Sequence, residues 1–232
     1  MNAEIYSPLF ISLKVALGAT LAIIPPGMAA AYLLARRDFF GKSLLETLLS
    51  LPLVLPPTAV GYLLLRMLGS RGILGRETLG FDPDILLTWK GALIAGGTMA
   101  FPLLVRTAKV AFSDVDSRLE NMARTLGMNR FEVFARITLP LAGRGLLAAI
   151  VLAFSRALGE FGATVIVAGN IPGKTQTLAL AIYNHIQVGR EAEATRLLLI
   201  TVFIAFILVW CVELLTRRAH SNRQAEDESR PS

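Results

Sequence analysis

Charged side chains are scarce in this sequence. Of its 232 residues, 17% are Asp, Glu, Lys or Arg, whereas soluble domains carry about a quarter. Hydrophobic residues make up 54%, and the mean hydropathy is +0.58. So much apolar surface needs a solvent other than water, and a lipid bilayer is the one that fits. The shortage of charge therefore argues against a soluble domain.

Cysteine and histidine are almost absent. Cys211 is the only cysteine, which excludes a disulfide within the chain and a cysteine metal site. His185 and His220 have no ligand-spaced partners, so no metal site is expected. The apolar runs contain no paired aspartates, no His–Ser pair and no zinc motif, so no catalytic residue is predicted. The run GNIPGKT at 169–175 is one residue short of a phosphate-binding loop and follows no strand, so nucleotide binding is not expected there.

The net charge of +6 indicates membrane topology rather than nucleic-acid binding. Basic residues gather at the ends of apolar runs instead of along one face. They are concentrated in the first and third connections and after the last run, and none precedes Lys14. The sequence therefore predicts a multi-pass protein of a bacterial cytoplasmic (inner) membrane, with its N-terminus outside and its C-terminus in the cytoplasm.

Five apolar segments are long enough to span a bilayer, which takes about 20 residues in a helix. They are residues 9–35, 44–68, 89–110, 141–168 and 196–215. We expect an all-α integral membrane protein with about five transmembrane helices. Residues 1–218 would form the transmembrane domain, and the polar tail at 219–232 is expected to be disordered.

Prolines interrupt two of these segments. Pro25-Pro26 predicts a kink in the first, and Pro52, Pro56 and Pro57 predict breaks in the second. Broken backbone is tolerated at membrane depth where protein or a water-filled cavity satisfies its polar groups. This pattern suits a bundle around a path, although ordinary kinking in a structural bundle would give the same prolines.

The polar loop at about 112–140 has no role in spanning a bilayer. Ser117 and Glu120 have the spacing of a capping box, and Gly127 predicts a left-handed stop, which together give a helix of about nine residues. Its apolar face comprises Leu119, Met122, Ala123 and Leu126. So short a helix is marginal in water and needs a partner. Asn129 would cap a second helix, and Pro140 would mark the start of the fourth span. The alternative is an amphipathic helix lying on the lipid surface.

This loop resembles the EAA loop of ABC importer permeases. The matching positions are Ala123, Gly127, Ile137, Leu139 and Pro140. Asn121 stands where the motif has Glu, Met122 replaces its first Ala, and Glu120 could supply the missing carboxylate from one position earlier. The resemblance implies a type I importer permease fold and a cytoplasmic coupling helix that docks on an ATPase. The ATPase-coupling residues would be Leu119, Glu120, Asn121, Met122, Ala123, Leu126, Gly127, Ile137 and Pro140.

Two further stretches, 51–65 and 155–187, resemble the molybdate permease subunits of these importers. The resemblance implies ATP-driven import of molybdate, with tungstate able to share the route. A sulfate/thiosulfate or a tungstate importer remains an alternative, and a non-transport membrane scaffold is a remote one. The implied partners are a second copy of the permease, two ATP-binding subunits on the cytoplasmic side and an external oxyanion-binding protein. The chain itself would hold no cofactor, while ATP and Mg would be used by the ATPase.

Arg156 and Glu160 form an i, i+4 pair late in the fourth apolar segment. Ionisable groups at such depth usually face a cavity or a bundle interior. The pair could line or gate an anion path, or it could neutralise itself and only lock the local packing. The predicted path residues are Pro56, Pro57, Thr58, Arg156, Gly159, Glu160, Gly162 and Thr164.

Overall fold

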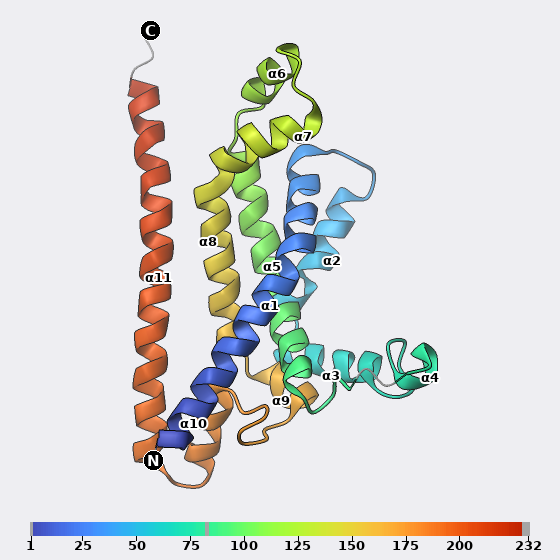
Figure 1. The fold of residues 1–232 in the computed structure, drawn as a ribbon, viewed down its shortest axis with the longest axis vertical. Helices are drawn as coiled ribbons and strands as arrows, with labels where there is room; N and C mark the ends of the chain where they lie inside the picture. The colour runs from blue at the N-terminus through green and yellow to red at the C-terminus, as the bar shows by residue number, and fades with distance from the viewer. Residues whose placement is uncertain (1, 82–83, 229–232) are drawn as a thin grey trace.

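The computed structural model describes residues 2–81 and 84–228, and every regular element in these ranges is helical (Figure 1). The helices are α1 (Asn2–Arg36), α2 (Lys42–Val54), α3 (Pro57–Leu68), α4 (Arg76–Leu79), α5 (Trp89–Ser113), α6 (Ser117–Thr125), α7 (Arg130–Val133), the π-helical turn η1 (Phe134–Thr138), α8 (Leu139–Leu158), α9 (Gly162–Ala168), α10 (Leu178–Gln187) and α11 (Glu191–Glu228). Within the described ranges, four helices are long and apolar enough to cross a membrane, and the bent pair α2–α3 can be counted as a fifth. This confirms the all-α fold with about five spans.

α5 forms the centre of the bundle and packs between α1 and α8. The contacts are made by small residues, which let helix backbones approach closely. Gly97 of α5 lies against Ala19 of α1, and Gly96 lies against Ala157 of α8. A Cβ added at Gly145 of α8 would lie 2.6 Å from the Cβ of Ala111, so this position needs glycine.

The second apolar segment is not one spanning rod. α2 ends at Val54, and α3 begins at Pro57 with its axis turned by 110°. Leu55 and Pro56 have ψ values of 142° and 134°, because the residue before a proline is pushed out of the α region and here two prolines follow in succession. The break predicted at Pro56 and Pro57 is confirmed, whereas Pro52 lies inside α2 and does not break it. As a consequence of the break, α3 runs across the bundle rather than along it (Figure 1).

The fourth apolar segment is also divided, which the single predicted span at 141–168 did not anticipate. α8 ends at Leu158, and α9 begins at Gly162. At its other end, α8 is continuous with α7 through η1. Pro140 lacks an N–H and its ring crowds the carbonyl four residues earlier. A π-type bond from the Leu139 N–H to the Phe134 carbonyl accommodates it.

The α1–α2 connection, α6 and the C-terminal end of α11 lie at one end of the molecule, here called the α6 end (Figure 1). The N-terminus, α9 and α10 lie at the other, the α10 end. The three basic regions of the sequence therefore share one end, as their charge pattern predicted. α11 continues to Glu228, where the sequence predicted a disordered tail from residue 219, because no glycine or proline interrupts residues 191–228. Residues 229–232 of that predicted tail lie outside the described ranges.

Candidate functional site

α6 projects from the bundle as a nine-residue helix (Figure 1). The Asp116 carboxylate caps it by accepting a hydrogen bond from the Arg118 N–H at 2.8 Å. The predicted Ser117–Glu120 capping box is wrong, because Asp116 provides the cap and the Glu120 side chain points elsewhere. Gly127 follows the helix at φ +91°, the left-handed stop that the sequence predicted.

The predicted apolar face of α6 divides into two parts. Leu119, Met122 and Leu126 are 44%, 62% and 82% exposed, and we call these three residues the apolar knob. Ala123 is buried, and α6 packs on α7 and η1. Asn121 is exposed beside the knob. Exposed apolar side chains on a projecting helix indicate a surface that binds another protein.

Glu120 joins α6 to two other helices. Its Oε1 accepts hydrogen bonds from Arg36 Nη2 of α1 at 2.8 Å and from the Thr138 hydroxyl of η1 at 2.7 Å. Arg36 Nη2 also donates to the Val115 carbonyl at 3.0 Å. Because the Glu120 side chain is only 6% exposed, this charged contact is poorly screened by water. Displacement of α6 would therefore be transmitted to α1 and α8.

The two other predicted coupling residues lie behind α6. Ile137 is half-buried in η1, and Pro140 is exposed in the first turn of α8. The structure thus gathers the predicted coupling residues at one end of the molecule, some facing outward and some supporting the helix from behind.

A basic pocket of about 510 Å³ lies next to α6. Its lining comprises Tyr32, Arg36, Arg37, Ser117, Glu120, Asn121, Arg124, Arg130, Phe131 and Phe134. Four arginines therefore face one carboxylate. Arg36 pairs with that carboxylate, while Arg37, Arg124 and Arg130 form no ion pair with any described residue. Asp38, which follows Arg37 in the chain, does not neutralise that arginine, because its carboxylate accepts a hydrogen bond from the Lys42 ammonium. This bond holds the pKa of the Asp38 carboxyl below its usual value. The pocket is thus net positive and suits an acidic partner surface.

The predicted path residues meet near the α10 end, where α3 crosses α9. Arg156 Nη1 lies 2.7 Å from Glu160 Oε2, so the predicted ion pair is present. The other carboxylate oxygen accepts a hydrogen bond from the Ala163 N–H at 2.8 Å, which fixes the start of α9. Glu160 is buried, and both of its oxygens have partners. This geometry supports a packing role for the pair.

Glycine allows α3 and α9 to approach this closely. A Cβ built on Gly162 would lie 2.8 Å from the Cβ of Pro57 and 3.3 Å from the Thr58 nitrogen. At this crossing, the α3 side contributes the exposed residues Pro56, Pro57 and Thr58, whereas Thr164 of α9 is buried. Gly159 is exposed at the end of α8. The predicted path residues therefore form one cluster, although several of them are covered by protein.

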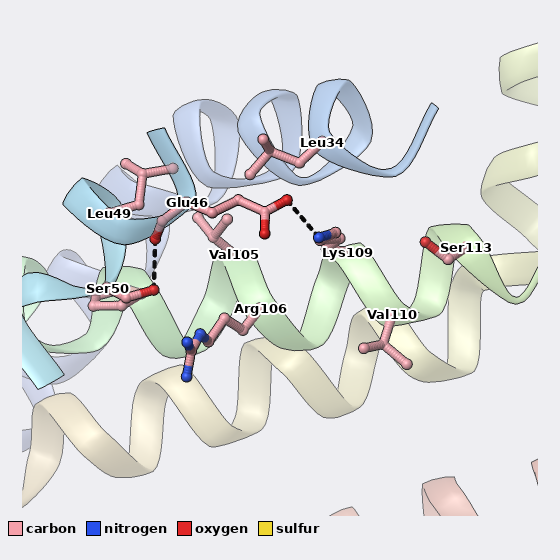
Figure 2. Close-up of a pocket in the computed structure, with 10 residues that line it drawn as sticks. Leu34, Glu46, Leu49, Ser50, Val105, Arg106, Lys109, Val110 and Ser113 are labelled. Atoms are coloured by element: carbon pink, nitrogen blue, oxygen red, sulfur yellow. Dashed lines mark hydrogen bonds and ion pairs between the residues drawn. The ribbon is translucent and has the colours of Figure 1, made fainter. Parts of the chain in front are cut away.

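A cavity of about 360 Å³ that the sequence did not indicate lies between α1, α2 and α5. Figure 2 shows residues that line it. Its lining residues are Leu34, Glu46, Leu49, Ser50, Pro102, Val105, Arg106, Lys109, Val110 and Ser113. Lys109 Nζ lies 2.5 Å from Glu46 Oε1, and this ion pair ties α2 to α5. In the sequence, Arg106 and Lys109 gave only a topology signal, because their tertiary neighbour Glu46 is 63 residues from Lys109.

No group of three or more His, Cys, Asp or Glu residues within the described part of the chain is placed to hold a metal ion. His185 is buried on α10. The side chain of His220 lies outside the described residues.

Comparison with known proteins identifies a family match over most of the chain. The family described as "Binding-protein-dependent transport system inner membrane component" matches residues 23–221. The molybdenum transport system permease protein ModB of Escherichia coli is 46% identical over 214 residues, which cover 91% of this chain and 93% of that protein. ModB of Haemophilus influenzae is 42% identical with the same coverage. The sulfate transport system permease protein CysT of Escherichia coli is 31% identical over 83% of this chain and 69% of its own.

Solved structures show the same fold. A bacterial ABC transporter involved in the import of the polysaccharide alginate matches with a TM-score of 0.73 and 18% identity, covering 93% of this chain and 79% of that one. An inward-facing MetNI methionine ABC transporter matches with a TM-score of 0.69 and 14% identity, covering 92% and 95%. At these identities the likeness concerns the fold alone.

Proposed function

Because the chain belongs to the family of binding-protein-dependent transport system inner membrane components, we propose that it is the permease subunit of an ATP-driven molybdate importer. The observation that carries this proposal is the 46% identity to a molybdenum permease over nearly the full length of both chains. The sulfate permeases CysT and CysW are less similar to this chain, at 31% and 35% identity. Tungstate is close to molybdate in size and charge, so it is the second ion expected to use the route.

In this proposal the ATPase is a separate subunit that grips the apolar knob. The exposed side chains of Leu119, Met122 and Leu126 would enter a groove on the ATPase, with the basic pocket beside them. ATP and Mg would be bound and consumed there, and this chain would contribute no catalytic residue. Movement of α6 would pass through Glu120 to Arg36 of α1 and to Thr138 of η1. Alternating access would follow from ATP binding more tightly to one of two arrangements of the helices.

The remaining partners follow from the surfaces left uncovered. α2 has no buried residue in the single chain, which supports a second copy packing on it to form a homodimer around the path. The α10 end would face outward and receive an oxyanion-binding protein. The α6 end, which holds the basic connections, would face the cytoplasm. The protein would thus lie in the bacterial inner membrane with its N-terminus outside.

Reconstitution tests the proposal directly. The permease would be purified with the ATPase and the oxyanion-binding protein of the same transport system, and placed in liposomes loaded with ATP and Mg. Uptake of molybdate, tungstate and sulfate would then be measured separately. We expect molybdate and tungstate to accumulate in an ATP-dependent way and sulfate to be excluded. Sulfate uptake without molybdate uptake would contradict the substrate assignment, and failure to bind any ATPase would contradict the permease assignment.

A further inference from the structure

Arg106 is a cation within a spanning helix that no carboxylate neutralises. Arg156 and Lys109 both have carboxylate partners, at 2.7 Å and 2.5 Å, whereas Arg106 forms no ion pair with a described residue. It precedes Ser113, the last residue of α5, by seven positions, or about 10 Å of helix. Arg106 is exposed in the single chain, and a guanidinium within a spanning helix usually faces a bundle interior, a cavity or an ion path rather than hydrocarbon.

The cavity lined by Arg106 carries net positive charge. Glu46 is the one carboxylate in its lining, and Lys109 neutralises it. Figure 2 shows the Arg106 guanidinium directed away from this ion pair, so Glu46 does not compete for it. The Ser113 hydroxyl belongs to the same lining, whereas the Ser50 hydroxyl donates its one proton to the Glu46 carbonyl at 2.7 Å and is not available to an anion.

These groups fit an oxyanion. The planar guanidinium offers parallel N–H donors that match two oxygens of one anion. The rest of the lining is mainly apolar, formed by residues such as Leu34, Leu49 and Val105. Once the second copy proposed above covers the exposed Arg106 side chain, these apolar walls would lower the local dielectric and so strengthen the attraction between a cation and an anion.

We propose that Arg106 binds the transported oxyanion in this cavity, on the α6 side of the α3–α9 crossing. The inference rests on the proposed function and adds to it a residue that touches the ion. It also gives the path a positive charge that the Arg156–Glu160 pair does not provide, because that arginine is already neutralised. An ion that had passed the crossing would meet Arg106 before leaving at the α6 end.

The test compares three variants of the reconstituted complex. Arg106→Gln removes the positive charge. Arg106→Lys keeps the charge but lacks the parallel N–H donors of the guanidinium. Arg144→Gln is the matched control, because Arg144 is an exposed arginine of α8 that does not line this cavity. We expect Arg106→Gln to lower molybdate uptake per ATP hydrolysed on the order of tenfold, the effect of losing one charge-assisted hydrogen bond. Arg106→Lys should retain more uptake than Arg106→Gln, and Arg144→Gln should match the wild type.

Two measurements separate this role from simpler ones. Co-purification of the ATPase should be unchanged in Arg106→Gln, which excludes loss of the fold as the cause. The amount of phosphatidylglycerol that co-purifies with Arg106→Gln should also equal that of the wild type. This result would exclude a binding site for a lipid phosphate at Arg106.

The inference fails if the wild type accumulates molybdate and Arg106→Gln accumulates it at the same rate as Arg144→Gln. The proposed function would still stand after that result. It also fails if Arg106→Gln loses bound phosphatidylglycerol with uptake intact, because the ligand would then be a lipid headgroup. Absence of molybdate uptake by the wild type would overturn both proposals together.

Discussion

Arg36 and Glu120 are separated by 84 residues in the sequence, yet their side chains lie 2.8 Å apart. The contact connects the end of α1 with the middle of α6, and Thr138 brings η1 into the same cluster. Because Glu120 is buried, it has to be satisfied by these groups rather than by water. α6 is therefore held as part of the bundle, although it projects from it.

The Arg36–Glu120 pair should be strongly coupled. Glu120→Ala leaves a largely buried arginine without its partner, and removing one member of such a pair typically costs about 3–5 kcal/mol. We expect thermal unfolding of the detergent-solubilised protein to show a large loss for Glu120→Ala and a further loss for Arg36→Ala, with a loss for the double variant that is smaller than the sum of the two. Asp38→Asn, in an exposed pair, serves as the control. Strictly additive effects in the double-mutant cycle would contradict the coupling.

Leu126→Asp should abolish binding of the ATPase while the permease stays folded. Leu126 is 82% exposed, so its replacement disturbs no packing within the chain. Substitutions at two other coupling residues, Ala123→Arg and Gly127→Pro, would test docking less directly, because Ala123 is buried and Gly127 has a positive φ, so both changes would also disturb the fold. Co-purification on a tagged permease, followed by thermal unfolding of the permease alone, would measure both effects. Normal recovery of the ATPase with Leu126→Asp would show that the knob is not the docking surface.

The basic pocket should make docking sensitive to salt. Arg124 lines the pocket, whereas Arg118 lies on the same helix outside it, and both are exposed. Arg124→Glu should weaken ATPase binding and reduce its dependence on ionic strength, while Arg118→Glu should have a smaller effect. Titration of the complex at several salt concentrations would compare the two variants. Equal losses would assign the effect to net charge rather than to the pocket.

Gly162→Ala should destabilise the α3–α9 crossing. The added Cβ would lie 2.8 Å from the Cβ of Pro57, and overpacking of this kind typically costs about 1–3 kcal/mol. Gly143→Ala is the matched control, because an added Cβ there meets nothing within 4 Å and lies inside α8. Alanine is the better helix former, so the control should be neutral or slightly stabilising. A lower unfolding temperature for Gly143→Ala than for Gly162→Ala would contradict this account.

Substitutions of Arg156 and Glu160 can separate the two roles left open by the sequence. If the pair only packs, Arg156→Gln combined with Glu160→Gln should support near-normal molybdate uptake, because the new amide can still accept from the Ala163 N–H. If the pair lines the path, the double variant should fold normally and lose uptake. Unfolding temperature and uptake by the same preparations would distinguish these outcomes. The geometry favours the first, since both carboxylate oxygens of Glu160 already have partners.

The sequence by itself determined the elements whose causes are local. Apolar runs long enough to cross a bilayer predicted the spanning helices. Two consecutive prolines predicted the break before α3, and Gly127 predicted the end of α6. Asn129 and Glu132 form the cap of α7, which also needs only neighbouring residues. In each case the physical cause lies within a few positions along the chain.

Only the tertiary structure decided which partners the charged side chains take. Glu120 had the spacing of a local cap, but it pairs with Arg36, because the folded chain brings its carboxylate against the positively charged guanidinium at the end of α1. Arg106 and Lys109 looked alike as topology signals, yet one is neutralised by Glu46 across the bundle and the other is not. Such differences depend on which helices pack together, and no local pattern encodes a contact made across 63 or 84 residues of chain.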